Sequence, residues 1–252
     1  MTNILLCGCS GRMGEAVSKL VGERDDAKII AGVDVSSSAQ VSGYPIYQSV
    51  SEFSGKADVI VDFSHHTALP SLLEYAVSAQ TPIVVCTTGH TEAELAAMGE
   101  ASKQVAVFHS GNMSIGINLL MELCKKAAET LGVAFDVEIV EKHHNKKLDA
   151  PSGTALMLAD AVKSTRESTE YVFDRHSVRR QRSAEEIGIH SVRGGTIVGE
   201  HEVIFAGNNE VITLSHSAAS REIFAAGAVR AAVFMTGKSA GLYNMSNVIN
   251  GK

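Results

Sequence analysis

The chain opens with the stretch Asn3-Ile4-Leu5-Leu6-Cys7-Gly8-Cys9-Ser10-Gly11-Arg12-Met13-Gly14. The run before Gly8 is apolar enough for a strand, and the glycines follow it at the spacing Gly-x-x-Gly-x-x-Gly, where a helix begins. Gly8 and Gly11 let the backbone approach a pyrophosphate closely, and Gly14 lets the helix pack on the strand. Backbone N–H groups at the start of that helix favour an anion. This order of strand, glycine turn and helix predicts a dinucleotide site.

Apolar runs and helical patterns alternate through the first part of the chain. The expected strands are Asn3–Cys7, Ala27–Val33, Val59–Asp62, Ile83–Cys86 and Val105–His109. The expected helices are Gly11–Gly22, Thr67–Ala79 and Thr91–Lys103, the last of which opens with a capping-box pattern. Such alternation predicts a parallel sheet covered by helices on both faces, that is, an α/β Rossmann-like domain.

An acidic residue stands where such a domain would bind a ribose. Asp34 ends the second expected strand, twenty residues after Gly14, so its carboxylate is placed to accept hydrogen bonds from the adenosine ribose. The following residues, Val35-Ser36-Ser37-Ser38, offer no cation to a 2′-phosphate, although Arg12 could reach one. The sequence therefore favours NADH and leaves NADPH open.

Two loops end expected strands of the same domain, where ligands bind in open α/β sheets. They are Cys86-Thr87-Thr88-Gly89-His90 and Ser110-Gly111-Asn112-Met113. Either loop could hold a nicotinamide carboxamide, and either could equally be ordinary turn chemistry.

The pattern changes in the second part of the chain. A longer helix is expected over Ser114–Leu131, followed by strands at Phe135–Lys142, Ile187–Val192, Thr196–Phe205 and Glu210–His216. The short connections Gly194-Gly195 and Gly207-Asn208-Asn209 predict that the strands they join are antiparallel neighbours. A final amphipathic helix is expected over Arg221–Gly237. We therefore expect a dinucleotide-binding domain of residues 1–112 and 219–252, and an α+β domain with an open mixed sheet at 113–218.

A basic segment follows the first strand of the second part: Glu141-Lys142-His143-His144-Asn145-Lys146-Lys147-Leu148-Asp149-Ala150-Pro151-Ser152-Gly153-Thr154. Pro151 suits a helix entry, and Ser152, Gly153 and Thr154 can then turn N–H groups and hydroxyls toward a carboxylate. Clustered cations lower the pKa of a Lys or His, which favours proton transfer near neutral pH. The segment predicts a site for a small anion with more than one carboxylate. A solvated basic loop is the alternative, and zinc is disfavoured because no third ligand accompanies the adjacent histidines.

Composition limits the other function classes. The formal net charge of −6 argues against a nucleic acid or an anionic membrane as partner. The four cysteines have neither a zinc spacing nor a disulfide framework, which is typical of a cytoplasmic protein. No signal peptide or membrane span is expected.

Taken together, these motifs resemble the dihydrodipicolinate reductase family. The residues that carry the resemblance are Gly8 to Gly14, Asp62-Phe63-Ser64, Thr87-Thr88-Gly89, the basic segment from Glu141 to Leu156, and Arg193 to His201. The resemblance implies a homotetramer assembled through the sheets of the substrate domain. It also implies reduction of 4-hydroxy-tetrahydrodipicolinate to tetrahydrodipicolinate by NAD(P)H, with loss of water, in the diaminopimelate route to lysine.

The resemblance also implies roles for individual residues. His143 matches the family's proton donor and acceptor, and Lys147 its proton donor. Substrate contacts are expected at His144, Ser152, Gly153, Thr154 and Thr88. Cofactor contacts are expected at Gly8, Cys9, Ser10, Gly11, Arg12, Met13, Asp34, Cys86, Thr87, Thr88, Ser110, Gly111, Asn112 and Met113, and no metal is expected. Two positions depart from the family pattern, Cys86 in place of a glycine and Val35 in place of a basic residue.

Two other functions fit part of the sequence. An NAD(P)-dependent sugar or polyol dehydrogenase would use Lys142 as its base, in an element where His143 replaces a proline. A non-catalytic NAD(P) sensor would keep the dinucleotide fold without turnover, since fold alone does not fix function. Such a sensor has little use for His143 and Lys147 together.

Overall fold

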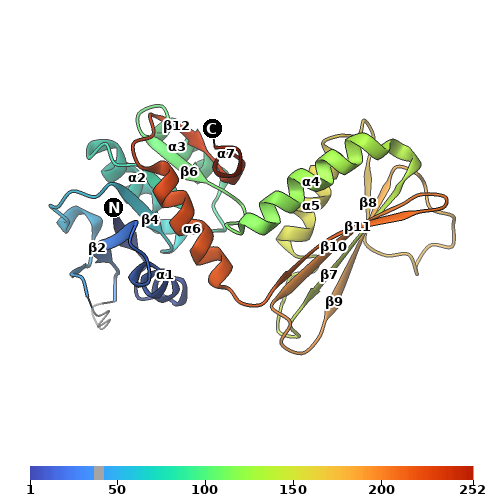
Figure 1. Cartoon of the computed structure of the whole chain (residues 1–252), viewed down its shortest axis with the longest axis horizontal. Helices are drawn as coiled ribbons and strands as arrows, with labels where there is room; N and C mark the ends of the chain where they lie inside the picture. Colours follow the sequence, from blue (N-terminus) through green and yellow to red (C-terminus); the bar gives the residue numbers. More distant parts are fainter. Residues whose placement is uncertain (37–42, 252) are drawn as a thin grey trace. The chain divides into compact units, whose positions relative to one another are not determined.

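The computed structural model describes residues 1–36 and 43–251, which form two compact units (Figure 1). The first, which we call the α/β unit, comprises Met1–Ile115 and Glu222–Lys252, and the second, the mixed-sheet unit, comprises Gly116–Arg221.

The α/β unit is built on a parallel sheet with the strand order β12-β6-β5-β4-β1-β2-β3. Its strands are β1 (Thr2–Cys7), β2 (Ala27–Val33), β3 (Ile46–Tyr47), β4 (Val59–Asp62), β5 (Ile83–Val85), β6 (Ala106–His109) and β12 (Gly241–Tyr243). Its helices are α1 (Arg12–Gly22), α2 (Leu69–Ser78), α3 (Glu92–Ala101), α6 (Glu222–Met235) and α7 (Met245–Asn250), with short 3₁₀ turns at η1 (Val50–Glu52) and η2 (His66–Ala68).

Successive strand residues in this sheet point to opposite faces, and each face has its own apolar core. Ile4 and Leu6 of β1 pack with residues of α1, α6 and α7, whereas Leu5 packs with residues of α2 and α3. The strand order reverses at β1, which lies between β4 and β2. Loops at the carboxyl ends of these strands therefore line a topological switch point, where open α/β sheets bind ligands.

The mixed-sheet unit has the strand order β11-β10-β7-β9-β8. Its strands are β7 (Asp136–His143), β8 (Glu170–Val172), β9 (Glu186–Arg193), β10 (Gly199–Ala206) and β11 (Val211–Ala218), and its helices are α4 (Ile115–Leu131), with the 3₁₀ turn η3 (Gly132–Ala134), and α5 (Gly153–Lys163). Both helices lie on one face of the sheet (Figure 1). We call the other side the open face. On the two central strands it carries Asp136, Glu138, Val140 and Lys142 of β7 and Glu200, Glu202, Ile204 and Ala206 of β10.

The predicted combination of a Rossmann-like α/β fold and an open mixed sheet is confirmed, but one predicted strand pairing is wrong. β10 and β11 are antiparallel neighbours as expected. β9 and β10, although joined by a short connection, are separated by β7, which pairs antiparallel with β10 and parallel with β9. The connection crosses the end of β7, where Gly194 N–H donates to the His143 carbonyl at 2.9 Å. β9 and β10 cannot pair with each other because β7 occupies an edge of each, along Val137–His143 for β9 and Asp136–Lys142 for β10.

Candidate active site

The glycine loop of the α/β unit adopts a conformation that two of its glycines make possible. Gly8 has a positive φ of 72°, and a Cβ there would lie 2.5 Å from the backbone of Phe63. A Cβ at Gly14 would lie 2.3 Å from the carbonyl oxygen of Gly8, so this glycine lets α1 pack on the loop itself. Gly11 is the N-cap of α1 and offers no side-chain cap, which leaves N–H groups of the first turn for another acceptor.

Asp34 lies beside this loop at the end of β2. Its Oδ2 accepts from Ser10 N–H and its Oδ1 from Ser36 N–H, both at 3.0 Å. A hollow of about 560 Å³ is lined by Gly8, Gly11 and Asp34 together with residues that follow β3 and β4. Of the chain after Asp34, Ser37 and Ser38 lie outside the described residues. Val35 is 90% exposed and lines the same hollow.

A second cavity of about 460 Å³ lies at the carboxyl ends of β4, β5 and β6. Its lining includes most of the residues of the two further cofactor loops, Cys86, Thr87, Thr88, Ser110, Gly111, Asn112 and Met113, together with Met13 of the glycine loop. The two hollows share Phe63, Ser64 and His65, so they adjoin. Three other predicted cofactor residues lie apart from both linings. Ser10 and Arg12 lie at the start of α1, and the Cys9 side chain is fully buried against Gly32, so only its backbone can meet a ligand.

Asp62, to which the sequence assigned no role, ties two of these loops together. Its carboxyl group is fully buried at the end of β4. It accepts from Ser64 N–H at 2.8 Å and from the Thr87 hydroxyl at 3.1 Å. Burial raises the pKa of Asp62, and the hydrogen bonds from Ser64 and Thr87 offset only part of that effect. A carboxylate at the end of an otherwise apolar strand was the signal that could have identified it.

In the mixed-sheet unit, β7 ends at His143. Glu141 and His143 lie in phase with the buried residues Val137 and Ile139, so both point away from the open face. The His143 Nδ1 lies 2.6 Å from Oε2 of Glu141. Burial alone would raise the pKa of Glu141, but hydrogen bonds from Arg193 and His143 outweigh burial and lower it from 4.5 to about 2. Glu141 is therefore ionised and accepts a hydrogen bond from the imidazole Nδ1–H.

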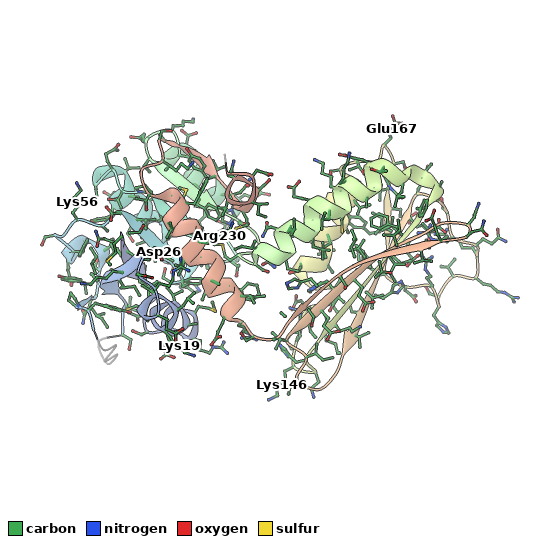
Figure 2. All side chains as sticks on the ribbon, viewed as in Figure 1. Lys19, Asp26, Lys56, Lys146, Glu167 and Arg230 are labelled. Carbon is green, nitrogen blue, oxygen red and sulfur yellow. The ribbon has the colours of Figure 1, made fainter. Side chains whose placement is uncertain are left out.

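The loop after β7 places its cations unequally. Lys147 Nζ lies 2.9 Å from Oδ1 of Asp149, and His144 is half-buried. Lys146 is exposed and points away from the sheet at the tip of the loop (Figure 2). Two of the four basic side chains of this loop therefore have a carboxylate partner, His143 with Glu141 and Lys147 with Asp149.

The start of α5 lies directly beyond this loop. Ser152 is its N-cap, and Oγ of Ser152 accepts from Ala155 N–H at 3.2 Å. Oγ also lies 3.1 Å from Nε2 of His201, whose ring packs edge-on against His143 with centroids 5.2 Å apart. Burial and the neighbouring His143 lower the pKa of His201 to about 4. Gly153 and Thr154 form the first turn of α5, so the predicted substrate residues His144, Ser152, Gly153 and Thr154 flank one loop, whereas Thr88 lines the cavity of the α/β unit.

Two further sequence hypotheses can be judged from the geometry. Lys142, the base required of a sugar or polyol dehydrogenase, lies on the open face and binds Glu200 at 3.3 Å and Glu202 at 2.8 Å, away from His143. Arg193, one of the residues that carry the family resemblance, is bonded through its guanidinium to Glu141. Among residues 1–36 and 43–251, no group of three or more His, Cys, Asp or Glu side chains is arranged to hold a metal ion.

Sequence comparisons cover both units. The family description "Dihydrodipicolinate reductase, N-terminus" matches residues 2–113, and "Dihydrodipicolinate reductase, C-terminus" matches residues 116–249. The 4-hydroxy-tetrahydrodipicolinate reductase of Caldanaerobacter subterraneus is 51% identical to the chain, with 99% of this chain and 98% of the relative covered. The enzyme of the same name from Clostridium novyi is 48% identical, with both chains covered fully.

Solved structures agree in fold. A dipicolinate-bound dihydrodipicolinate reductase from Paenisporosarcina sp. TG-14 has a TM-score of 0.81 at 24% identity, with 97% of each chain covered. A myo-inositol 2-dehydrogenase from Lactobacillus plantarum has a TM-score of 0.59 at 12% identity, with 100% and 90% covered, which reflects the shared fold alone. From the matches over both units, the chain belongs to the dihydrodipicolinate reductase family, oxidoreductases with 4-hydroxy-tetrahydrodipicolinate reductase activity in lysine biosynthesis.

Proposed function

We propose that the chain carries out this reduction with NADH or NADPH bound by residues 1–112 and 219–252, and that residues 113–218 bind the dicarboxylate substrate. The nicotinamide, when bound, supplies the hydride, and the substrate loses its 4-hydroxyl as water. The observation that carries the proposal is the buried 2.6 Å contact between Glu141 and His143 Nδ1, next to the start of α5. Because Glu141 occupies Nδ1, Nε2 is the nitrogen of His143 that would exchange a proton with the substrate. The start of α5, beside it, would bind a substrate carboxylate.

The α/β unit fits a dinucleotide. The uncapped start of α1, with Gly8, Cys9, Ser10, Gly11, Arg12 and Met13, suits a pyrophosphate because N–H groups and the helix dipole favour an anion there. Asp34 would accept from ribose hydroxyls in the 560 Å³ hollow. A 2′-phosphate would meet that carboxylate without a cation at Val35, which supports preference for NADH or use of both cofactors. Cys86, Thr87, Thr88 and Ser110 to Met113 would hold the nicotinamide in the 460 Å³ cavity.

The mixed-sheet unit fits a dicarboxylate. Gly153 and Thr154, just after the N-cap Ser152, begin α5, an eleven-residue helix whose N-terminal potential favours a carboxylate. His144 and Lys147 add donors from the preceding loop. Thr88 would contribute from the nicotinamide loop. Dipicolinate, named as the ligand of the Paenisporosarcina relative, is such a dicarboxylate.

Two groups would handle protons. The Nδ1–H of His143 donates to the ionised Glu141, so Nε2 is the atom that exchanges a proton with the substrate. The Lys147 ammonium would donate a second proton, and the contact with Asp149 holds it near the start of α5. General acid–base groups of this kind accelerate a step by about 10²–10⁴-fold.

The assembly and location belong to the same proposal. We infer a homotetramer that pairs copies of the mixed-sheet unit through their open faces. A cytoplasmic location agrees with four free, buried cysteines, and the described residues contain no helix with the length and apolarity to cross a membrane.

Steady-state kinetics with freshly prepared 4-hydroxy-tetrahydrodipicolinate tests the assigned roles. His143→Ala and Lys147→Ala should each lower kcat by about 10²–10⁴-fold and leave NADH affinity nearly unchanged. Lys146→Ala is the matched control, because that side chain points into solvent. Loss of NADH binding in either site variant would contradict the division of labour between the units. Binding of NADH by the wild-type chain without turnover would instead indicate a sensor.

Initial rates with the two cofactors test the role of Asp34. Asp34→Ala should weaken NADH more than NADPH, because it removes a ribose acceptor from both but also removes repulsion from the 2′-phosphate. Equal losses for the two cofactors would exclude Asp34 from the ribose site.

A further inference from the structure

A single buried carboxylate connects three parts of the mixed-sheet unit. Glu141 is fully buried, and Oε2 faces both His143 Nδ1 at 2.6 Å and Arg193 Nη1 at 2.8 Å. Its Oε1 accepts from Arg193 Nη2 at 2.7 Å and from Ser152 N–H at 3.0 Å. Strand β7, strand β9 and the start of α5 therefore meet at one side chain.

Arg193 compensates the buried charge of Glu141. A buried carboxylate is tolerated when it is paired and fully hydrogen-bonded, and a guanidinium matches both of its oxygens. The same guanidinium donates from Nη2 to the Asp149 carbonyl at 2.6 Å and from Nη1 to the Val192 carbonyl at 2.8 Å. The Glu141–Arg193 ion pair thus holds both ends of the loop that carries Lys147. Glu141 contacts His143 before the loop, and Arg193 contacts Asp149 near its end.

We propose that Glu141, held by Arg193, is a positioning residue for the reduction: it fixes the tautomer and orientation of His143 and, through the same carboxylate, the carboxylate-binding start of α5. The inference rests on the proposed roles of His143 and α5. A single group then sets the distance between the proton-exchanging Nε2 and the bound substrate. Loss of the carboxylate should affect kcat through the first link and substrate affinity through the second.

An amide cannot replace this carboxylate. Arg193 donates to both oxygens, so either orientation of a Gln side chain would turn an NH₂ group against a guanidinium N–H. With its NH₂ group in the place of Oε1, the amide would face two fixed donors, Ser152 N–H and Arg193 Nη2. With its NH₂ group in the place of Oε2, it would face Arg193 Nη1 and His143 Nδ1, and the imidazole can relieve its part of the conflict by carrying its proton on Nε2. Glu141→Gln therefore preserves shape while favouring the Nε2–H tautomer of His143.

Charged and titratable groups reach His143 from several elements. Glu141 lies on β7 itself, Arg193 pairs with His143 from β9, and the ring of His201 on β10 packs against it, whereas Lys147, in the loop after β7, acts on His201. Only Glu141 contacts Nδ1 in the described part of the chain, so the tautomer of His143 reports on this contact specifically. Nitrogen-15 NMR of histidine-labelled protein distinguishes the two tautomers.

The experiment compares wild type, Glu141→Gln and Glu141→Asp, with Glu129→Gln, an exposed glutamate of α4, as the control. In wild type, neutral His143 should carry its proton on Nδ1. In Glu141→Gln the tautomer should change, kcat should fall by about 10²-fold or more, and dipicolinate should bind several-fold more weakly, with NADH affinity unchanged. Glu141→Asp, which keeps the charge, should recover part of the loss. The control should match wild type throughout.

A double-mutant comparison separates positioning from a general structural effect. If Glu141 acts on turnover through His143, Glu141→Gln should lower kcat much less in a His143→Ala background than in wild type. Equal factors in the two backgrounds would overturn the inference. Wild-type His143 with its proton on Nε2 would overturn it as well, and this measurement does not require any variant to fold.

Failure of the proposed function gives a different result. If His143→Ala turned over at the wild-type rate, His143 would have no role in the reaction. The tautomer of His143 in the unmutated chain would still depend on Glu141. An unchanged tautomer in Glu141→Gln, with turnover lost in His143→Ala, would leave the proposed function intact and exclude positioning by Glu141.

Discussion

Gly199 lies next to the His143 ring, which has room there because glycine has no Cβ. A Cβ there would lie 3.1 Å from Nε2 of His143 and 3.4 Å from its Cδ2. The residue sits in strand β10 without a positive φ, so an alanine fits the backbone but displaces the imidazole by a few tenths of an ångström. We expect Gly199→Ala to lower kcat by about tenfold, since small misplacements of a reacting group are costly.

Steady-state kinetics would measure this effect beside the control Gly194→Ala, where an added Cβ meets no atom within 4 Å. NADH affinity and melting temperature should change little in both variants. Unchanged turnover in Gly199→Ala would mean that the position of His143 tolerates displacement and is not tightly coupled to the reaction.

His201 should make the stability of the protein depend on pH. Its pKa is lowered from 6.5 to about 4 by burial and by the neighbouring His143. Between these values the unfolded chain binds a proton that the folded chain does not, so stability is full above about pH 6.5 and falls as the pH drops toward 4. The loss at the acid end is about 3 kcal/mol for this group.

Melting temperatures recorded between pH 7 and pH 5 would detect this slope before the carboxylates titrate. His201→Gln should give a flatter profile than wild type, whatever its absolute stability. His176→Gln, which alters an exposed imidazole, should keep the wild-type slope. A slope unaffected by His201→Gln would assign the pH dependence to other groups.

At the scale of elements, the N-terminus of α5 combines a structural and a binding role in one residue. Ser152→Ala removes the hydroxyl that caps Ala155 N–H and contacts His201, in a position only 2% exposed. Loss of an N-cap costs about 1 kcal/mol, so the melting temperature should fall. The first turn should also loosen, and dipicolinate should bind more weakly in calorimetric titrations.

Ser164→Ala provides the comparison at the opposite end of α5, where the hydroxyl donates to Ala161 and the residue is exposed. It should leave dipicolinate affinity unchanged. If Ser152→Ala lowers the melting temperature but not the affinity, the substrate carboxylate does not bind at the start of this helix.

Most long elements could be predicted from the sequence because their periodicity extends over several residues. β2 and β4 have the predicted bounds, and the capping box that begins α3 is formed by Thr91 and Glu94. β8 and β12, three residues each, lack the apolar run that identifies the equally short β5, and β12 depends on β6, a partner distant in sequence. The place of β7 between β9 and β10 was also missed, because the order of strands in a sheet depends on contacts between segments far apart in the sequence.

The sequence predicted the site residues whose chemical type the reaction or the cofactor requires. It did not predict the residues that only hold other site residues in position. His143, Lys147 and the glycines belong to motifs that can be recognised from the order and spacing of residues alone. Glu141 and Asp62 act as buried acceptors, and an acidic residue in a strand usually indicates a solvent-facing position. The available signal was phase, because Glu141 alternates with Val137 and Ile139 and so belongs to the buried side of β7.

At the scale of the whole molecule, the open face of the mixed sheet is the surface on which the proposed tetramer depends. Ion pairs such as Lys142–Glu202 and His190–Glu138 cross it, and apolar residues lie among them. Val140 lies near its centre, opposite Glu202 on one neighbouring strand and His190 on the other. An arginine at this position can pair with Glu202 within one chain, yet it adds bulk and charge to a face that must meet its copy.

We therefore expect wild type to behave in light scattering as four chains of 26.7 kDa and Val140→Arg to dissociate to smaller species. Val133→Arg, which changes a residue 66% exposed in the turn after α4, should remain tetrameric. NADH binding should survive in dissociated Val140→Arg, because the cofactor residues belong to the α/β unit. A monomeric wild type, or a Val140→Arg protein that remains a tetramer, would exclude assembly through this face.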